Sequence, residues 1–186
     1  MADPARRLAS YDDLEALPAG LVGQLVGGTL YAQPRPASPH ARAASVLGVD
    51  LGGPFDRGRG GPGGWILLAE PELHLGGDVL VPDLAGWRRE RMPLMPRVPA
   101  FELAPDWVCE VLSPSTAGLD RVKKLGVYLR EGVRHVWFVD PEGRTLEVLR
   151  SAGESYLLAR TFTGDEPVRA EPFDAVDLEL GALWRG

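Results

Sequence analysis

The run WVCEVL, Trp107 to Leu112, places one carboxylate inside an otherwise apolar segment. Its β-branched and aromatic residues, bounded by proline on one side and Ser-Pro on the other, predict a strand that is buried on at least one face. An ionised carboxylate taken out of water costs on the order of several kcal/mol unless a partner compensates it, or its pKa rises by roughly 3 to 5 units. Glu110 therefore either has a cationic partner or points outward at the end of the strand, and the rest of the chain must decide between these.

The composition is that of an ordinary globular protein of 186 residues, with 45% hydrophobic and 25% charged residues. We expect one domain over residues 1–186, of α/β or α+β class. No apolar segment approaches the ~18 residues needed to cross a bilayer, and the N-terminus lacks the apolar core of a signal peptide, so we expect a cytoplasmic protein with no membrane partner. A net charge of −6 argues against an extended basic footprint for nucleic acid, but not against a local basic cleft.

Apolar spacing and turn residues predict the order of the structural elements. The predicted elements are a short helix over 10–18 capped by Ser10, a β-hairpin that turns at Gly27-Gly28, a helix over 38–51, a flexible Gly-Pro loop over 52–64, strands over 65–75 and 78–87, a Pro-rich loop over 92–105, the strand that contains Glu110, a helix over about 119–131 that stops at Gly132, three strands within 133–163, and a terminal strand-to-helix segment over 174–184.

Three charged features stand close to these apolar segments. Asp83 follows a proline in a strand, Glu110 lies on the next core strand, and Lys123 or Lys124 lies on the helix after it. Two carboxylates on neighbouring apolar strands repel each other unless a hard cation bridges them, and oxygen ligands of this kind suit Mg²⁺ or Mn²⁺. Helical geometry alone does not choose between the lysines, because both lie at similar angles from the apolar stripe that includes Val122.

The order Pro-Asp, then Glu on the next core strand, then a helical Lys, resembles the PD-(D/E)XK nuclease superfamily. More narrowly, VPDLAGW and EVLSPSTAGLDRVKKLGVYLREGVRHVWFVDP resemble the Uma-type family, whose largely uncharacterised bacterial members are described as restriction endonucleases. GQLVGGTLYAQPRPASPH resembles the amino-terminal hairpin and the following helix start of that family. The resemblance spans nearly the whole chain and implies a restriction-endonuclease-like core, with a mixed β-sheet flanked by helices and an N-terminal β-hairpin.

The resemblance implies metal-assisted hydrolysis of DNA phosphodiester bonds by an endonuclease, acting as a homodimer. Asp83, Glu110 and the backbone carbonyl of Val111 would hold one Mg²⁺ or Mn²⁺. Lys124 would orient the attacking water or neutralise the developing charge, and Asp120, at its i−4 position, would orient the lysine. The superfamily commonly has its lysine two residues after the glutamate, where this chain has leucine, so only the Uma-type pattern of Asp, two or three residues, then Lys favours Lys124.

Several supporting positions carry less weight. Gln24 stands where the family usually has Glu, and a neutral amide ligates a hard cation less well, which disfavours a second metal. His40 is a capping or phosphate-contact residue as readily as a ligand, and Tyr128 either lines the site or is a core aromatic. The arginines that would supply a local basic rim are Arg35, Arg57, Arg59 and Arg121.

Two other classes of function compete with the nuclease. The acidic net charge and Gln24 motivate a catalytically weak or inactive nuclease-fold protein that acts as a binding or assembly module. A purely structural protein without any ligand leaves the placement of Glu110 unexplained.

Overall fold

The centre of the protein is a six-stranded mixed sheet with the strand order β10-β9-β8-β7-β6-β3 in a computed structural model that describes residues 7–34 and 37–185. β7 and β8 pair in parallel, and the other neighbouring strands of this sheet pair antiparallel. The strands are β3 (Trp65–Ala69), β6 (Leu84–Arg88), β7 (Trp107–Val111), β8 (His135–Asp140), β9 (Thr145–Ala152) and β10 (Ser155–Thr163).

A second sheet of four strands has the order β2-β1-β5-β4. Its β1–β2 hairpin turns at Gly27 and Gly28, which both have positive φ, the conformation that a two-residue hairpin turn requires. The strands are β1 (Leu21–Val26), β2 (Thr29–Pro34), β4 (Leu73–Leu75) and β5 (Asp78–Leu80), and a separate short pair joins β11 (Pro167–Val168) to β12 (Leu178–Glu179).

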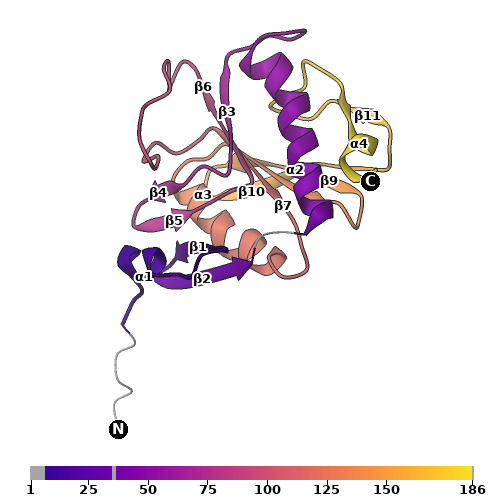
Figure 1. Ribbon diagram of the computed structural model, residues 1–186. Coiled ribbons are helices and arrows are strands. Elements are labelled where there is room, and N and C mark those ends of the chain that lie inside the picture. Colours follow the sequence, from indigo (N-terminus) through magenta and orange to yellow (C-terminus); the bar gives the residue numbers. More distant parts are fainter. Residues whose placement is uncertain (1–6, 35–36, 186) are drawn as a thin grey trace.

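Helices cover the sheet. Figure 1 shows α2 running along the large sheet, with the β1–β2 hairpin next to the start of α2 and with α3 close to that hairpin. The helical segments are α1 (Tyr11–Glu15), α2 (Ser38–Leu51), η1 (Gly52–Asp56), η2 (Leu119–Lys124), α3 (Leu125–Arg130) and α4 (Leu180–Trp184). The predicted mixed sheet flanked by helices, with its N-terminal hairpin, is confirmed. Across residues 7–34 and 37–185, no helix has both the length and the apolar character that a bilayer crossing requires.

The alternation of side chains along β7 determines which way Glu110 points. Trp107, Cys109 and Val111 pack in the core cluster that contains the buried residues of α2 and α4. Val108 packs in the cluster on the other face, which contains the buried residues of η2 and α3. Because successive side chains of a strand point to opposite faces, Glu110 faces the η2–α3 side. Glu110 is therefore buried rather than pointing outward at the end of the strand.

The predictions of single strands over 65–75 and 78–87 were wrong. Each segment is two strands, one in each sheet, because the chain leaves the large sheet after β3 and re-enters it at β6. The breaks fall at Pro71 and Pro82, which have no backbone N–H to donate to a ladder. Glu70 adopts a φ of 48° at the first break. Asp83 consequently lies at the junction of the two sheets rather than inside a strand.

Two helical segments are wound as π-helices, which the spacing of apolar residues did not predict. The segment expected to begin a flexible loop at Gly52 instead continues α2 through η1. Phe55 of η1 is buried and packs against Phe173 with ring centroids 4.8 Å apart, which explains why this glycine-rich segment is ordered helix up to Asp56. The predicted helix over 119–131 is present, but η2 forms its first part.

Candidate active site

A cavity of about 380 Å³ opens between the β1–β2 hairpin, the start of α2, the end of β7 and η2. All but one of the catalytic, metal-ligating and supporting residues predicted from the sequence line this cavity, together with ten other residues. The predicted residues that line it are Gln24, His40, Asp83, Glu110, Val111, Asp120 and Lys124, and the exception is Tyr128. Residues that span a hundred positions of the chain thus meet in one place.

The two predicted carboxylates both line this cavity, Glu110 on β7 and Asp83 directly before β6. Leu84 of β6 pairs with Cys109 of β7, so the antiparallel register places Asp83 across from Glu110. Residues directly opposite in such a pair point to the same face. The Oδ2 atom of Asp83 also accepts a hydrogen bond from the N–H of Val111 at 2.7 Å, which fixes the carboxylate against the end of β7.

Lys124 is the cationic partner of Glu110. Its Nζ atom lies 2.7 Å from Oε1 of Glu110 and donates to Oδ1 of Asp120 at 3.0 Å. Its exposed fraction is 1%, whereas Lys123 is exposed to solvent. Val122 is 68% exposed, so the apolar stripe predicted from α-helical spacing was wrong. The π-helical winding of η2 rotates Asp120 and Lys124 inward together.

Tyr128 contributes to the site and to the core at once. Its ring is fully buried within the cluster on the η2–α3 side of the sheet. Its hydroxyl donates to Oε1 of Glu110 at 2.5 Å. Tyr128 is therefore a core aromatic residue whose hydroxyl reaches the site by binding Glu110.

Burial dominates the protonation behaviour of this cluster. Desolvation raises the pKa of Glu110 to about 8, although the charge of Lys124 opposes that shift. Burial alone would lower the pKa of Lys124, but the carboxylates of Glu110 and Asp120 raise it above its ordinary value. Burial, together with Glu110, raises the pKa of the Tyr128 hydroxyl well above its usual range. Tyr128 and Lys124 therefore remain proton donors toward Glu110 at neutral pH.

His40 lies against the other carboxylate. Its Nε2 atom is 3.2 Å from Oδ1 of Asp83. Burial disfavours the imidazolium, but the hydrogen bond to Asp83 and the charges of Asp83 and Asp120 raise the pKa of His40 above its ordinary value. His40 does not cap α2, because Ala37 is the N-cap residue of that helix. The ring instead holds the carboxylate of Asp83 through its Nε2 atom.

Gln24 holds the hairpin to the sheet junction. Its Oε1 atom accepts a hydrogen bond from the N–H of Val81 at 2.9 Å. Val81 lies just before Pro82 and Asp83, so the amide oxygen of Gln24 is already engaged in positioning the segment that presents Asp83.

A family model described as "Uma2: Putative restriction endonuclease" matches residues 8–181. The chain belongs to this family. A solved structure described as a "putative nuclease belonging to DUF820 from Anabaena variabilis" matches with a TM-score of 0.70 over 94% of this chain and 97% of that chain, at 22% identity. At that identity the likeness shows the fold alone. No curated protein matches the chain.

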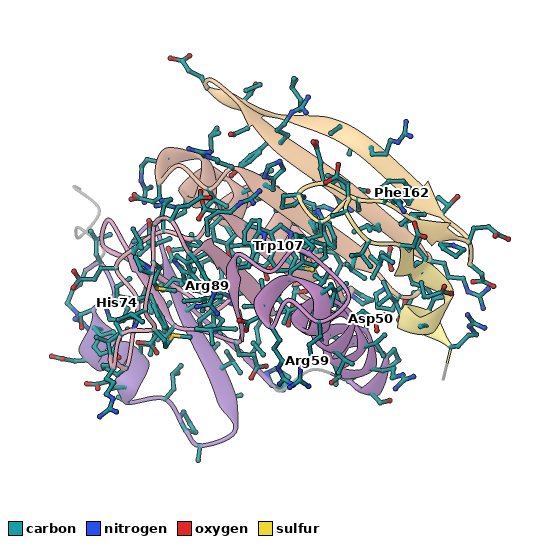
Figure 2. The ribbon with its side chains drawn as sticks, turned by 90° about the horizontal axis from the view of Figure 1, so that it is seen from above. Asp50, Arg59, His74, Arg89, Trp107 and Phe162 are labelled. Carbon is teal, nitrogen blue, oxygen red and sulfur yellow. The ribbon has the colours of Figure 1, made fainter. Side chains whose placement is uncertain are left out.

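None of the described arginines considered as a basic rim of this Uma2-family protein lines the cavity itself. Arg121 makes two hydrogen bonds to Glu147, at 2.6 and 3.0 Å. Arg57 and Arg59 come after η1, which continues the C-terminal end of α2, whereas the cavity lies at the start of α2, a helix about 21 Å long. Figure 2 shows Arg59 at the periphery, away from the centrally placed Trp107. Arg35 lies outside the described residues.

Sequence patterns missed several residues that line the cavity of the Uma2-family chain. Glu70 is exposed at the break after β3, and Pro71 is the signal that would have separated it from the strand. Ser113 and Thr116 line the cavity after β7, with Oγ of Ser113 3.1 Å from Oγ1 of Thr116. A polar Ser-Pro-Ser-Thr run directly after the strand of Glu110 was the available signal, but its Ser-Pro was interpreted only as the boundary of that strand.

The donor atoms at the floor of the cavity suit a hard divalent cation. Asp83, Glu110 and the Val111 backbone supply oxygen atoms, the ligands that Mg²⁺ and Mn²⁺ prefer. In the part of the chain that the structure describes, no three His, Cys, Asp or Glu side chains form a metal-binding group. This donor set therefore fits an ion that keeps several waters, as Mg²⁺ does, better than an ion held entirely by side chains.

Proposed function

We propose that this Uma2-family protein is a metal-dependent endonuclease that hydrolyses phosphodiester bonds in DNA. The family and the solved nuclease structure support a nuclease-type function. The observation that carries the finer proposal is the meeting of Asp83, Glu110 and the buried ammonium of Lys124 in one cavity. Two neighbouring carboxylates can hold a metal ion, and an adjacent cation can stabilise the negative charge that develops in metal-assisted phosphodiester hydrolysis.

Asp83, Glu110 and the Val111 carbonyl would hold one Mg²⁺ or Mn²⁺ ion. That ion would supply a bound water of lowered pKa and would stabilise negative charge on the phosphate. The protein must provide deprotonated ligands, and Val111 and His40 already hold the Asp83 carboxylate in place from both of its oxygen atoms.

Lys124 would act on the reacting groups through its ammonium. Asp120 holds Nζ from the same helical segment, so the ammonium keeps one carboxylate partner when Glu110 turns toward a cation. The remaining protons of Lys124 would then donate to the attacking water or to a phosphate oxygen and would stabilise the negative charge that develops there. Tyr128 would restrict the rotation of Glu110 through its hydrogen bond.

The test is a cleavage assay on plasmid and single-stranded DNA with Mg²⁺, Mn²⁺ or EDTA. We expect cleavage with either ion and none with EDTA. Asp83→Asn should abolish cleavage, and Asp174→Asn, which changes an exposed carboxylate, should not. Cleavage that persists in EDTA, or in purified Asp83→Asn, would contradict the proposal.

A binding or assembly module is the second candidate. The paired state of the site favours it, because Glu110 already contacts Lys124 and Tyr128, and the Gln24 amide oxygen already accepts from Val81. This candidate predicts no cleavage under any of the three conditions. The homodimer and the cytoplasmic location stay predictions from the sequence.

A further inference from the structure

The reactive groups of the candidate site are recessed. The exposed fractions of Glu110 and Lys124 are 2% and 1%, and both residues line a cavity of about 380 Å³. A cube of that volume has an edge of about 7 Å. A B-form duplex, whose major groove alone is about 12 Å wide, does not enter such a space. A continuous duplex can therefore present only its outer phosphates at the mouth of the cavity, whereas a flexible single strand can bend into it and bring a phosphate to these recessed groups.

The upper walls of the cavity fit the sugar and base of a single nucleotide. Val22 and Gln33 face each other across the β1–β2 hairpin and line one wall. Pro114 and Thr116 also line the cavity, on the segment that follows β7. A paired base has both faces stacked and its pairing edge occupied, so apolar walls and amide groups gain no contact with it. An unpaired base presents its apolar faces and its hydrogen-bonding edge to such walls.

The charges of the cavity also disfavour a long duplex footprint. Among the described lining residues, four are acidic and the cationic side chains are His40 and Lys124. Duplex binding draws most of its affinity from rows of Lys and Arg on successive phosphates. Arg121 is paired with Glu147, and Arg57 and Arg59 lie beyond the far end of α2. The basic side chains at the cavity can therefore bind only a few phosphates, those next to a single nucleotide.

We propose that the cavity takes an unpaired nucleotide and that the preferred substrate is single-stranded DNA, or the single-stranded tail of a duplex, rather than continuous duplex. This inference rests on the proposed nuclease function, because it assigns the substrate class of the same site.

The experiment separates binding from hydrolysis. Fluorescence anisotropy with Ca²⁺ in place of Mg²⁺ measures the binding of one labelled sequence as a single strand, as a blunt duplex, and as a duplex with an unpaired tail. We expect the single strand and the tailed duplex to bind at least about tenfold more tightly than the blunt duplex. A cleavage assay with Mn²⁺ on the same three substrates should cut only the single-stranded parts.

Matched variants tie the preference to the cavity. Val22→Trp fills the hairpin wall and should remove the preference for unpaired DNA, whereas Leu21→Trp, on the neighbouring position that does not line the cavity, should keep it. Gln33→Trp and Ala32→Trp provide a second pair on β2 with the same expectation, in case Val22→Trp fails to fold by circular dichroism.

The outcomes distinguish this inference from the proposed function. Preferential binding of unpaired DNA that Val22→Trp or Gln33→Trp removes, without any cleavage, supports the substrate class and overturns the hydrolytic function. Equal binding and cutting of the blunt duplex overturns the substrate class and leaves the nuclease standing. Absence of binding to all three DNAs, or a preference unchanged in both cavity variants, also overturns the inference.

Discussion

Replacing Glu110 with Gln should remove a pH dependence of stability that one buried carboxyl creates. The pKa of Glu110 is raised from 4.5 to about 8, chiefly by desolvation. A group with a raised folded-state pKa holds its proton more tightly in the folded protein than in the unfolded chain. Its contribution to stability is therefore fully present below about pH 4.5 and is lost as the pH rises toward 8.

The magnitude follows from the same two values. Between pH 4.5 and 8 the free energy of unfolding should fall by up to about 1.4 kcal/mol per pH unit through this one group, or about 5 kcal/mol in all. Glutamine has nearly the same shape and cannot ionise, and its amide oxygen can still accept from Tyr128 and Lys124. The variant should therefore be about as stable as the wild type near pH 5 and more stable above pH 8.

The assay is urea unfolding followed by circular dichroism at a series of pH values from 5 to 9. Glu154→Gln, which changes an exposed carboxylate on the β9–β10 turn, is the control and should give a curve parallel to the wild type. A Glu110→Gln curve that also runs parallel to the wild type would refute the reasoning, because Glu110 would then titrate alike in the folded and unfolded chain.

The same variant links the carboxyl to the metal. An ion that binds only the folded state adds RT ln(1 + [L]/Kd), roughly 2.7 kcal/mol at a hundredfold excess over Kd. Because the ion must displace a proton from Glu110, its affinity should rise about tenfold per pH unit up to about pH 8. Equal shifts in Tm with Mn²⁺ for the wild type and Glu110→Gln would place the ion elsewhere.

Three further substitutions test the neighbours of Glu110. Lys124→Ala should abolish cleavage of single-stranded DNA while Lys123→Ala leaves the initial rate within about twofold, because only Lys124 is buried in the site; the reverse result would assign the role to Lys123. Tyr128→Phe should lower the urea-unfolding free energy by about 1 to 3 kcal/mol through the lost hydrogen bond to Glu110, and unchanged stability would deny that bond. Gln24→Glu should strengthen Mn²⁺ binding in calorimetry by adding a carboxylate, and an unchanged Kd would show that position 24 does not reach the ion.

Much of the site follows from the sequence because one physical argument, the cost of burying Glu110, already requires a cation nearby. The structure supplies that cation in Lys124. What the sequence did not predict is the winding that brings it there. Apolar spacing was read with the α-helical period, which left Lys123 and Lys124 equivalent and placed Val122 inside. The π-helical winding of η2 was not part of that pattern, because apolar spacing was tested only against the α-helical period.

The strand breaks at Pro71 and Pro82 show a second limit. Each proline marks a position that cannot donate to a ladder, so the breaks themselves were open to prediction. Which sheet each half joins depends on pairing with strands far along the chain, such as β5 with β1. Local patterns carry no information about such partners, and so the position of Asp83 at a junction between two sheets became apparent only in the structure.

The spread of the site along the chain has a consequence for folding. β7 to β10 are neighbours both in sequence and in the sheet, so these strands need mainly short connections to form. The cavity also needs Gln24, His40 and Asp83, which pair or pack with partners many residues away, and such non-local contacts are slow to form. A chain still being synthesised lacks Lys124 when His40 and Asp83 are already made. The candidate site is therefore acquired late, together with the completed fold, and partly folded chains do not carry it.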